Sequence, residues 1–147
     1  MLKGLMLALA AAITVLGGAA AATAGDEREL VEMPPPMAAH MLANMRDHLR
    51  ALEEMLGALA AGDVTTAGHV AEHRLGMSSL DNHGAAHMAP MMPEGMRAIG
   101  TEMHRAASRF VTAAQDASVG GDHPAVYAAL RDITAQCNAC HAAYRVR

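Results

Sequence analysis

The sequence has few aromatic residues: it contains no tryptophan, one phenylalanine, Phe110, and two tyrosines, Tyr127 and Tyr144. A core with so few large rings must be filled mainly by leucine, valine, isoleucine, alanine and the flexible side chain of methionine. The chain has 13 methionines, and 52% of its residues are hydrophobic. This is enough apolar material for one domain, and a large apolar cofactor would help to complete its core.

Basic residues are also in the minority, with 11 lysines and arginines against 15 aspartates and glutamates, for a formal net charge of −4. Proteins that bind nucleic acid usually carry a basic surface, so we expect no nucleic-acid partner. The spacing of the polar residues predicts no Ser/His/Asp set, carboxylate pair or phosphate-binding loop. Nothing therefore indicates hydrolytic or transfer catalysis, and we do not expect an enzyme.

Residues 1–24 have the layout of a secretory signal peptide. Lys3 is followed by a run of apolar and small residues that ends in Ala22-Thr23-Ala24. Cleavage near Ala24 would export the remaining chain to the periplasm, and we expect no membrane association afterwards. A membrane anchor is the alternative, because the apolar run from residue 5 to 22 approaches the length that spans a bilayer. The small residues that precede Gly25 favour cleavage.

A helical pattern begins after Pro34-Pro35-Pro36. The segment 37–61 contains no further proline, and its apolar face recurs at steps of 3 and 4 through Met41, Met45, His48, Leu52, Met55 and Leu59. Gly62 ends this predicted helix, and Asp63 can cap a second one that runs from Val64 to about Met77. The pattern predicts two helices joined by a tight turn.

The second half of the chain repeats this layout after a loop at 78–95, which is rich in proline and glycine. A third helix is predicted from about Glu94 to Ala117, with an inner face of Met96, Ile99, Met103, Ala106, Phe110 and Ala113. Asp122 and Pro124 begin a fourth, whose inner face is expected to be Tyr127, Leu130, Thr134, Cys137, His141 and Tyr144. Residues 34–147 therefore predict an all-α domain, an antiparallel four-helix bundle, preceded by an N-terminal extension at 25–33.

The only two cysteines, Cys137 and Cys140, are three residues apart, and the second directly precedes His141. Residues at i, i+3 and i+4 share one face of a helix, so all three side chains are expected to point into the bundle. This geometry lets two thiols form thioethers to the vinyl groups of a haem while the imidazole reaches its iron. The motif predicts one covalently attached haem c.

Three other interpretations of the cysteine pair stay open. A thioredoxin-like redox pair would lie at a helix N-terminus, whereas this pair lies in the last predicted turns. A zinc site would need a further ligand, for which His69 and His73 are the nearest candidates. A structural disulfide is common in exported proteins, but it leaves His141 and Tyr144 unexplained.

Residues 137–145, Cys-Asn-Ala-Cys-His-Ala-Ala-Tyr-Arg, resemble the haem-binding end of the cytochrome c′ and cytochrome c-556 family. The resemblance covers the helical layout of residues 34–147, and its motif is confined to residues 137–147. It implies that Cys137 and Cys140 carry the thioethers, that His141 is the proximal iron ligand, and that Arg145 is the basic residue that follows this ligand, with Tyr144 also in the haem environment. Arg145 lies one turn beyond His141, where it could pair with a haem propionate; a solvated cation at the helix end is the alternative.

The residue on the other face of the iron separates two functions. In the resembled family it comes from the first helix, where methionine gives a low-spin electron carrier and a non-ligating residue leaves the iron open to gases. The family spacing falls near Met45, with Met41 or His48 as alternatives, although methionines at this spacing otherwise serve as core filler. We expect a periplasmic electron-transfer cytochrome with a redox partner protein. A five-coordinate cytochrome c′ that binds NO or CO is the alternative, and the family's frequent homodimers leave a dimer open.

Histidines and methionines also crowd the middle of the chain: His69, His73, Met77, His83, His87, Met88, Met91, Met92 and Met96. Thioethers and imidazoles suit copper, so a Met/His-rich periplasmic copper-binding protein, with a site in the loop 87–92, is a second alternative. Core packing by the methionines explains the same residues, and we favour it.

Overall fold

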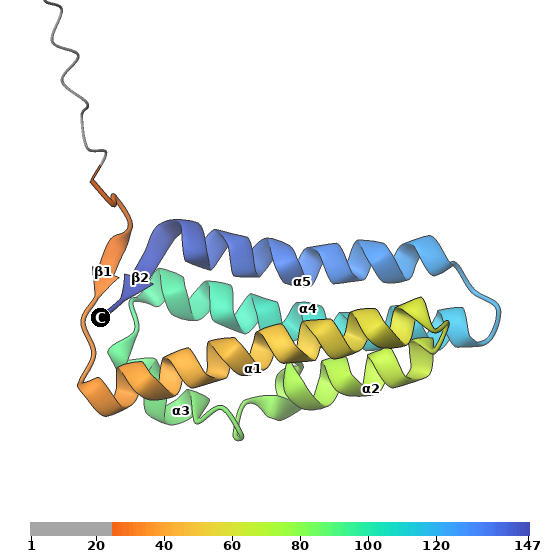
Figure 1. Cartoon of the computed structure of the whole chain (residues 1–147), viewed down its shortest axis with the longest axis horizontal. Coiled ribbons are helices and arrows are strands. Elements are labelled where there is room, and N and C mark those ends of the chain that lie inside the picture. The colour runs from red at the N-terminus through yellow and green to blue at the C-terminus, as the bar shows by residue number, and fades with distance from the viewer. Residues whose placement is uncertain (1–24) are drawn as a thin grey trace, which may run out of the picture.

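A computed structural model of the chain describes residues 25–147, and the predicted signal peptide at 1–24 lies outside the described residues. The described chain is mostly helical, which confirms the prediction of an all-α fold. Four long helices lie side by side and alternate in direction along the chain: α1 (Pro35–Ala60), α2 (Val64–Arg74), α4 (Glu94–Ser118) and α5 (His123–Ala143) (Figure 1). Among the helices of residues 25–147, none combines the length and the apolar character needed to cross a membrane.

The helix ends follow local sequence signals. Pro35 and Pro36 occupy the first turn of α1, where a missing backbone N–H costs no helical hydrogen bond. Asp63 caps α2 as predicted, because its side chain accepts a hydrogen bond from the Thr66 backbone N–H at 2.9 Å. Helix α2 ends at Arg74, slightly before the predicted end. Asp122 occupies the N-cap position of α5 as predicted, but within the described chain its side chain makes no capping hydrogen bond.

Short helical turns, rather than a plain loop, connect α2 to α4. They are η1 (Met77–Ser79), α3 (Ala85–Met88) and η2 (Ala89–Met91). The hydroxyl of the buried Ser79 donates a hydrogen bond to the Gly76 carbonyl oxygen at 2.7 Å. Gly84 adopts a positive φ of 61°, which a residue with a side chain would rarely tolerate. These turns carry the buried Met88 into the core.

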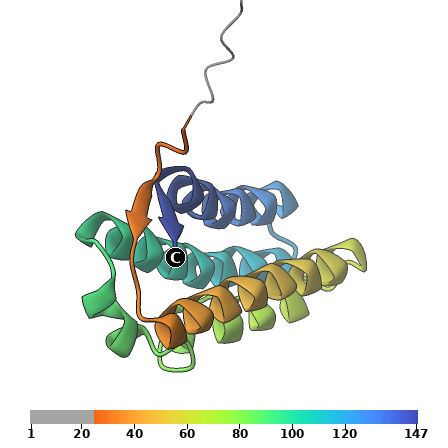
Figure 2. The same cartoon turned by 60° about the vertical axis from the view of Figure 1, so that its left-hand side comes forward.

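Two three-residue strands join the ends of the described chain. Strand β1 (Glu29–Val31) pairs in parallel with β2 (Tyr144–Val146) (Figures 1 and 2). In this pairing Leu30 lies opposite Arg145. Val31 is buried, so the predicted N-terminal extension covers part of the core. The sequence does not predict these strands, because three residues are too few to show an alternating pattern.

The core consists of two apolar clusters. One lies between the long helices and includes Met55, Phe110 and Ile133. The other lies where the chain ends meet, and its buried residues are Val31, Met33, Met41, Met88 and Met96. Helices α2 and α4 approach closely because small residues meet between them: a Cβ added to Gly68 would lie 3.3 Å from the Ala114 Cβ.

The inner face of α5 differs from the predicted one. Tyr127 is 56% exposed, whereas Val126 and Ile133 are buried. Val126 and Ile133 are seven residues apart and therefore share one side of the helix, which turns Tyr127 outward. For α1 and α4 the predicted faces are largely confirmed, since Met41, Met55, Met103 and Phe110 are all buried.

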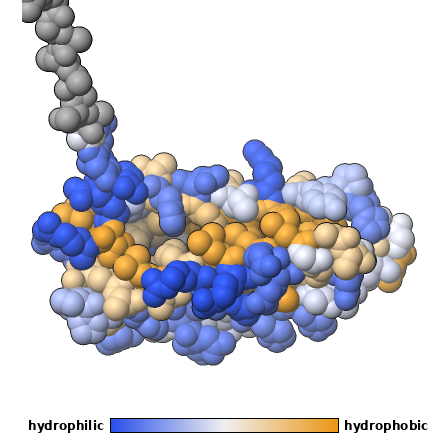
Figure 3. All heavy atoms as spheres, in the orientation of Figure 1, coloured by the Kyte–Doolittle hydropathy of each residue, from blue (hydrophilic) through white to orange (hydrophobic). Residues whose placement is uncertain are grey.

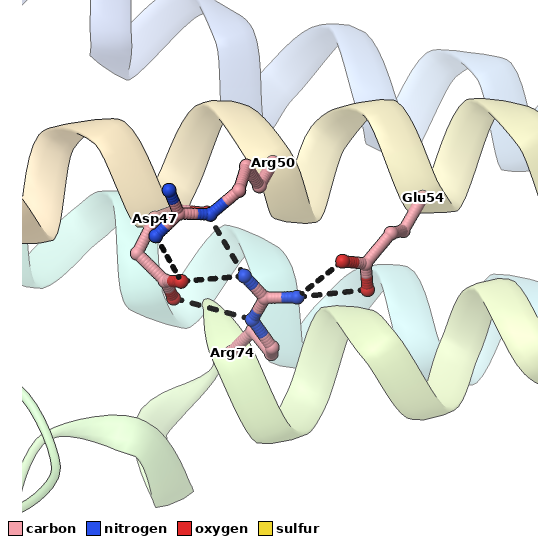
Figure 4. A network of polar contacts seen from close by, with 4 residues as sticks. All are labelled: Asp47, Arg50, Glu54 and Arg74. Carbon is pink, nitrogen blue, oxygen red and sulfur yellow. Dashed lines mark hydrogen bonds and ion pairs between the residues drawn. The ribbon is translucent and has the colours of Figure 1, made fainter.

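A charged network centred on Arg74 ties the end of α2 to α1 (Figure 4). The Arg74 guanidinium donates to Asp47 Oδ1 at 2.6 Å and to both Glu54 carboxylate oxygens at 2.7 Å. Arg50 adds one contact of 3.2 Å to Asp47. The hydrogen bond from Arg74 lowers the pKa of Asp47 below its ordinary 3.8. The side chains of Arg74 and Asp47 are only 26% and 32% exposed, so solvent screens this pair incompletely.

Replacing Arg74 with glutamine is expected to lower the free energy of unfolding at pH 7 by about 1–2 kcal/mol, because several charge-assisted hydrogen bonds are lost together. The matched variant Arg50→Gln, which removes one exposed contact, should cost less than about 0.5 kcal/mol. Urea denaturation measures both values. Since the depressed pKa of Asp47 stabilises the fold only while the carboxylate is ionised, the Arg74→Gln effect should shrink as the pH falls below 3.8. Equal losses in the two variants would contradict a role for the network.

Candidate functional site

A cavity lies between α1 and α5. Helix α1 packs against α2, α2 against α4, and α4 against α5. Helices α1 and α5 face each other across the cavity. Figure 3 shows apolar atoms gathered in a band along this side of the molecule, between polar edges. We call this space the α1–α5 cavity. Its lining comes from α1 (Met41, Asn44, Met45, His48), α4 (Met96, Ile99, Gly100, Met103, His104), α5 (Gln136, Cys137, Cys140, His141) and the connecting turns (His83, Ala85, Met88, Met92).

The predicted haem-attachment residues Cys137, Cys140 and His141 all line the α1–α5 cavity. Both cysteines are half-buried, and within the described chain neither is joined in a disulfide. Burial raises the pKa of both thiols, which is the opposite of the depressed thiol pKa of a thioredoxin-like pair. The disulfide and redox-pair interpretations are therefore not favoured.

His141 does not lie in the interior of the bundle, contrary to expectation. His141 is exposed at the edge of the cavity, whereas the cysteines are half-buried. The reason is its position: α5 ends at Ala143, so His141 lies in the last turn, beyond the buried residues Val126 and Ile133.

A second space, which we call the C-terminal pocket, shares Cys140 and His141 with the α1–α5 cavity. Met41 and Met45 also line both spaces, whereas His48 lines only the α1–α5 cavity. Met41 is buried and Met45 is half-buried. Of the three candidates on α1 for the distal position, the two methionines therefore share more of their surroundings with His141. The full lining is Arg28, Met41, Leu42, Met45, Met96, Cys140, His141, Tyr144, Arg145 and Val146.

Three buried histidines gather at the α1–α5 cavity: His48 from α1, His83 from the connecting turns and His104 from α4. Their ring centroids are 4.7 Å apart for His48 and His83, 5.9 Å for His48 and His104, and 5.6 Å for His83 and His104. Burial lowers the pKa of all three, that of His48 to about 4. All three imidazoles are therefore neutral at pH 7.

Hydrogen bonds hold the rings of His104 and His83 in place, but not the Nε2 atom of His48. His104 Nδ1–H donates to the Leu75 carbonyl oxygen at 2.6 Å. His83 Nδ1 lies 3.4 Å from the Ser79 hydroxyl oxygen, which can accept because its own hydrogen is donated to Gly76. His48 Nε2 is buried and has no hydrogen-bond partner among residues 25–147. A cavity-lining imidazole nitrogen without a partner is available to a ligand.

His104 is the residue of this group that the sequence analysis does not single out. It follows Met103 on the third predicted helix, and in the structure both are buried. Attention to polar residues next to the predicted inner face would have found it. His83 is expected there only as part of a copper-binding region.

The two residues that follow the motif lie in β2. The Tyr144 hydroxyl group packs against Gly95, where a Cβ would collide with it. Arg145 Nε lies 3.5 Å from Asp26 Oδ2, within ion-pair distance. Both residues line the C-terminal pocket beside His141.

The residues considered for a copper or zinc site are spread over the molecule. Met88 and Met96 belong to the core cluster at the chain ends, whereas His69 and His73 lie on the exposed face of α2 with their rings stacked at 6.2 Å. Within the described chain, no group of three or more histidine, cysteine, aspartate and glutamate side chains is placed to hold a metal ion. The burial of these methionines is consistent with core packing.

Comparisons with protein-family models, with curated proteins and with solved structures find no match for the chain. The chemistry of the cavity must therefore carry the assignment of a cofactor. Two thiols outside any disulfide, a neighbouring imidazole and a mostly apolar lining with thioethers fit a covalently attached haem.

The hydrogen bond between His104 and Leu75 leads to a stability prediction. Replacing His104 with leucine leaves the carbonyl of the buried Leu75 without its donor, which should lower the free energy of unfolding by about 1–3 kcal/mol. His104→Asn is the matched control, because its amide N–H can occupy the place of Nδ1–H, and it should lose less. Chemical denaturation of both variants measures the difference. A leucine variant as stable as the asparagine variant would contradict this role of the hydrogen bond.

Proposed function

We propose that this chain is a periplasmic monohaem c-type cytochrome of the cytochrome c′ and cytochrome c-556 type, an antiparallel four-helix bundle that carries single electrons. Cys137 and Cys140 would hold one haem c through thioethers, with His141 as the proximal iron ligand. The observation that carries the proposal is that these three residues of α5 share the α1–α5 cavity with Met41 and Met45 of α1. When bound, the haem supplies the one-electron chemistry.

The side chains that line the cavity would have different roles around the haem. Met45 of α1 is the proposed distal ligand, and a thioether there raises the reduction potential of the iron. Buried methionines such as Met88 and Met103 exclude water, which keeps the surroundings of the iron apolar. Because His141 is exposed at the cavity edge, a redox partner protein could approach the cofactor from that side.

Gas binding at five-coordinate iron is the second candidate function. The observation that favours it is the free Nε2 of His48 in the same cavity, which could form a hydrogen bond with a small ligand such as NO or CO. In that case Met41 and Met45 would only pack. The spectrum of the reduced protein with and without CO separates the two functions.

Homodimer formation is compatible with either function. Leu42, Leu49 and Leu56 are exposed on α1 and are seven residues apart, so they form one apolar stripe along this helix. Measuring the mass of the protein in solution tests this part of the proposal.

Replacing Met45 with leucine removes the sulfur but nearly keeps the volume, so the fold should be retained. We expect the reduced haem of this variant to become five-coordinate and its affinity for CO to rise at least tenfold. The ferric protein should lose the weak red absorption of a methionine–iron bond. Absorption spectra and CO titration measure both changes.

Two further leucine variants control this experiment. Met41→Leu tests the neighbouring candidate ligand, and Met55→Leu changes a buried methionine of α1 that lines neither space. Neither control should alter the spectrum. An unchanged Met45→Leu spectrum would remove Met45 as the ligand, and a change in Met41→Leu instead would transfer the role to Met41.

A further inference from the structure

Two guanidinium groups line the C-terminal pocket beside Cys140 and His141. Arg28 directly precedes β1, and Arg145 belongs to β2. The two residues lie near opposite ends of the described chain. The parallel pairing of β1 with β2 (Figure 2) brings these ends together, and both arginines line the same pocket. Without this strand pair, Arg28 would have no fixed position relative to the haem-attachment motif.

Asp26 is the acidic group that both arginines contact. Arg28 donates hydrogen bonds from Nε and Nη2 to the two Asp26 carboxylate oxygens at 2.8 and 2.7 Å. These hydrogen bonds lower the pKa of Asp26 to about 2, so this carboxylate is ionised at neutral pH. Arg145 Nε lies 3.5 Å from the same carboxylate. Two positive charges therefore share one negative charge, and the cluster retains an excess of positive charge.

Donor groups remain free in this cluster. Among residues 25–147, the Arg145 guanidinium makes no hydrogen bond, because the 3.5 Å contact with Asp26 fits an ion pair but not a hydrogen bond, and its Nε is buried. Arg28 Nη1 donates to the His141 carbonyl oxygen at 3.4 Å, which ties this arginine to the backbone of the proposed iron ligand. A buried N–H without an acceptor is unfavourable. A carboxylate is the acceptor whose two oxygens best match guanidinium donors.

We infer that Arg28 and Arg145 together form a carboxylate-binding site beside His141, and that its ligands are the propionate groups of the haem. This inference rests on the proposed function, since the haem would supply the carboxylates. The sequence already suggests this role for Arg145. For Arg28 the role follows from the strand pair and from its contacts with Asp26 and the His141 carbonyl oxygen.

Arg147, which lies next to the same strand pair, provides a matched control. It follows β2 and pairs with Glu32 at 3.4 Å, and both side chains are about three-quarters exposed. Arg147 lines neither the α1–α5 cavity nor the C-terminal pocket. Its replacement removes a positive charge from the same end of the molecule without touching the proposed site.

The test is the reduction potential of the exported, haem-containing protein, measured by optical redox titration. A positive charge near the iron or its propionates favours the reduced state, so Arg28→Gln and Arg145→Gln should each lower the equilibrium constant for reduction at least threefold. For a one-electron couple, a tenfold change corresponds to 59 mV. Arg147→Gln should leave the constant unchanged, Arg28→Lys should retain most of the wild-type value, and Asp26→Asn should raise it.

The outcomes separate this inference from the proposed function. A wild-type protein without covalent haem would overturn both. A haem-containing Arg28→Gln variant with the potential of Arg147→Gln would overturn the carboxylate site alone. If Arg28 only stabilises the strand pair, Arg28→Gln would lower the unfolding midpoint while its potential stayed equal to that of Arg147→Gln, and this result would also overturn the inference.

Discussion

The cavity between α1 and α5 determines which side chains of this chain can meet around a cofactor. Helix α1 packs on α2 and α5 packs on α4, so the two outer helices meet across a space lined by sulfur and imidazole groups. In a chain with one phenylalanine and no tryptophan, methionine and alanine must fill the interior. Methionine side chains can adapt to an inserted ring system more easily than rigid aromatic residues can. A core rich in methionine therefore suits the proposed cofactor site.

Two sets of interactions hold the walls of this cavity in place. On one side, Arg74 links α2 to Asp47 and Glu54 of α1. On the other side, the pairing of β1 with β2 holds the residues that follow His141. Arg28 and Arg145, which both contact Asp26, lie next to this strand pair or in it and line the C-terminal pocket with the proposed proximal ligand. The segments that hold the two ends of the described chain together thus also carry the charged groups beside the motif.

The helices and most of their buried faces could be predicted from the sequence, because apolar residues at steps of 3 and 4 recur over many turns of α1 and α4. Cys137, Cys140 and His141 could be grouped because their spacing places them on one side of a helix. On α5 the prediction of the inner face relied on Tyr127, whereas the adjacent Val126 is buried and Tyr127 faces outward.

The missed features depend on contacts between distant segments. The strands are too short to leave a pattern, so neither their pairing nor the position of Arg28 could be predicted. The burial of His83 and its proximity to His48 and His104 depend on the path of the turns between α2 and α4. Helical periodicity carries no information about such a path. Predictions from the sequence therefore covered the elements and the motif better than the surroundings of the motif.

The pyridine haemochrome spectrum of the exported protein, combined with its intact mass, tests whether Cys137 and Cys140 carry a covalent haem. We expect one haem per chain, bound through two thioethers, and a mass that includes the haem after cleavage near Ala24. Loss of the haem from a Cys137→Ser, Cys140→Ser variant would agree with this assignment. An exported protein whose mass shows no haem and whose two thiols remain free to react would contradict it.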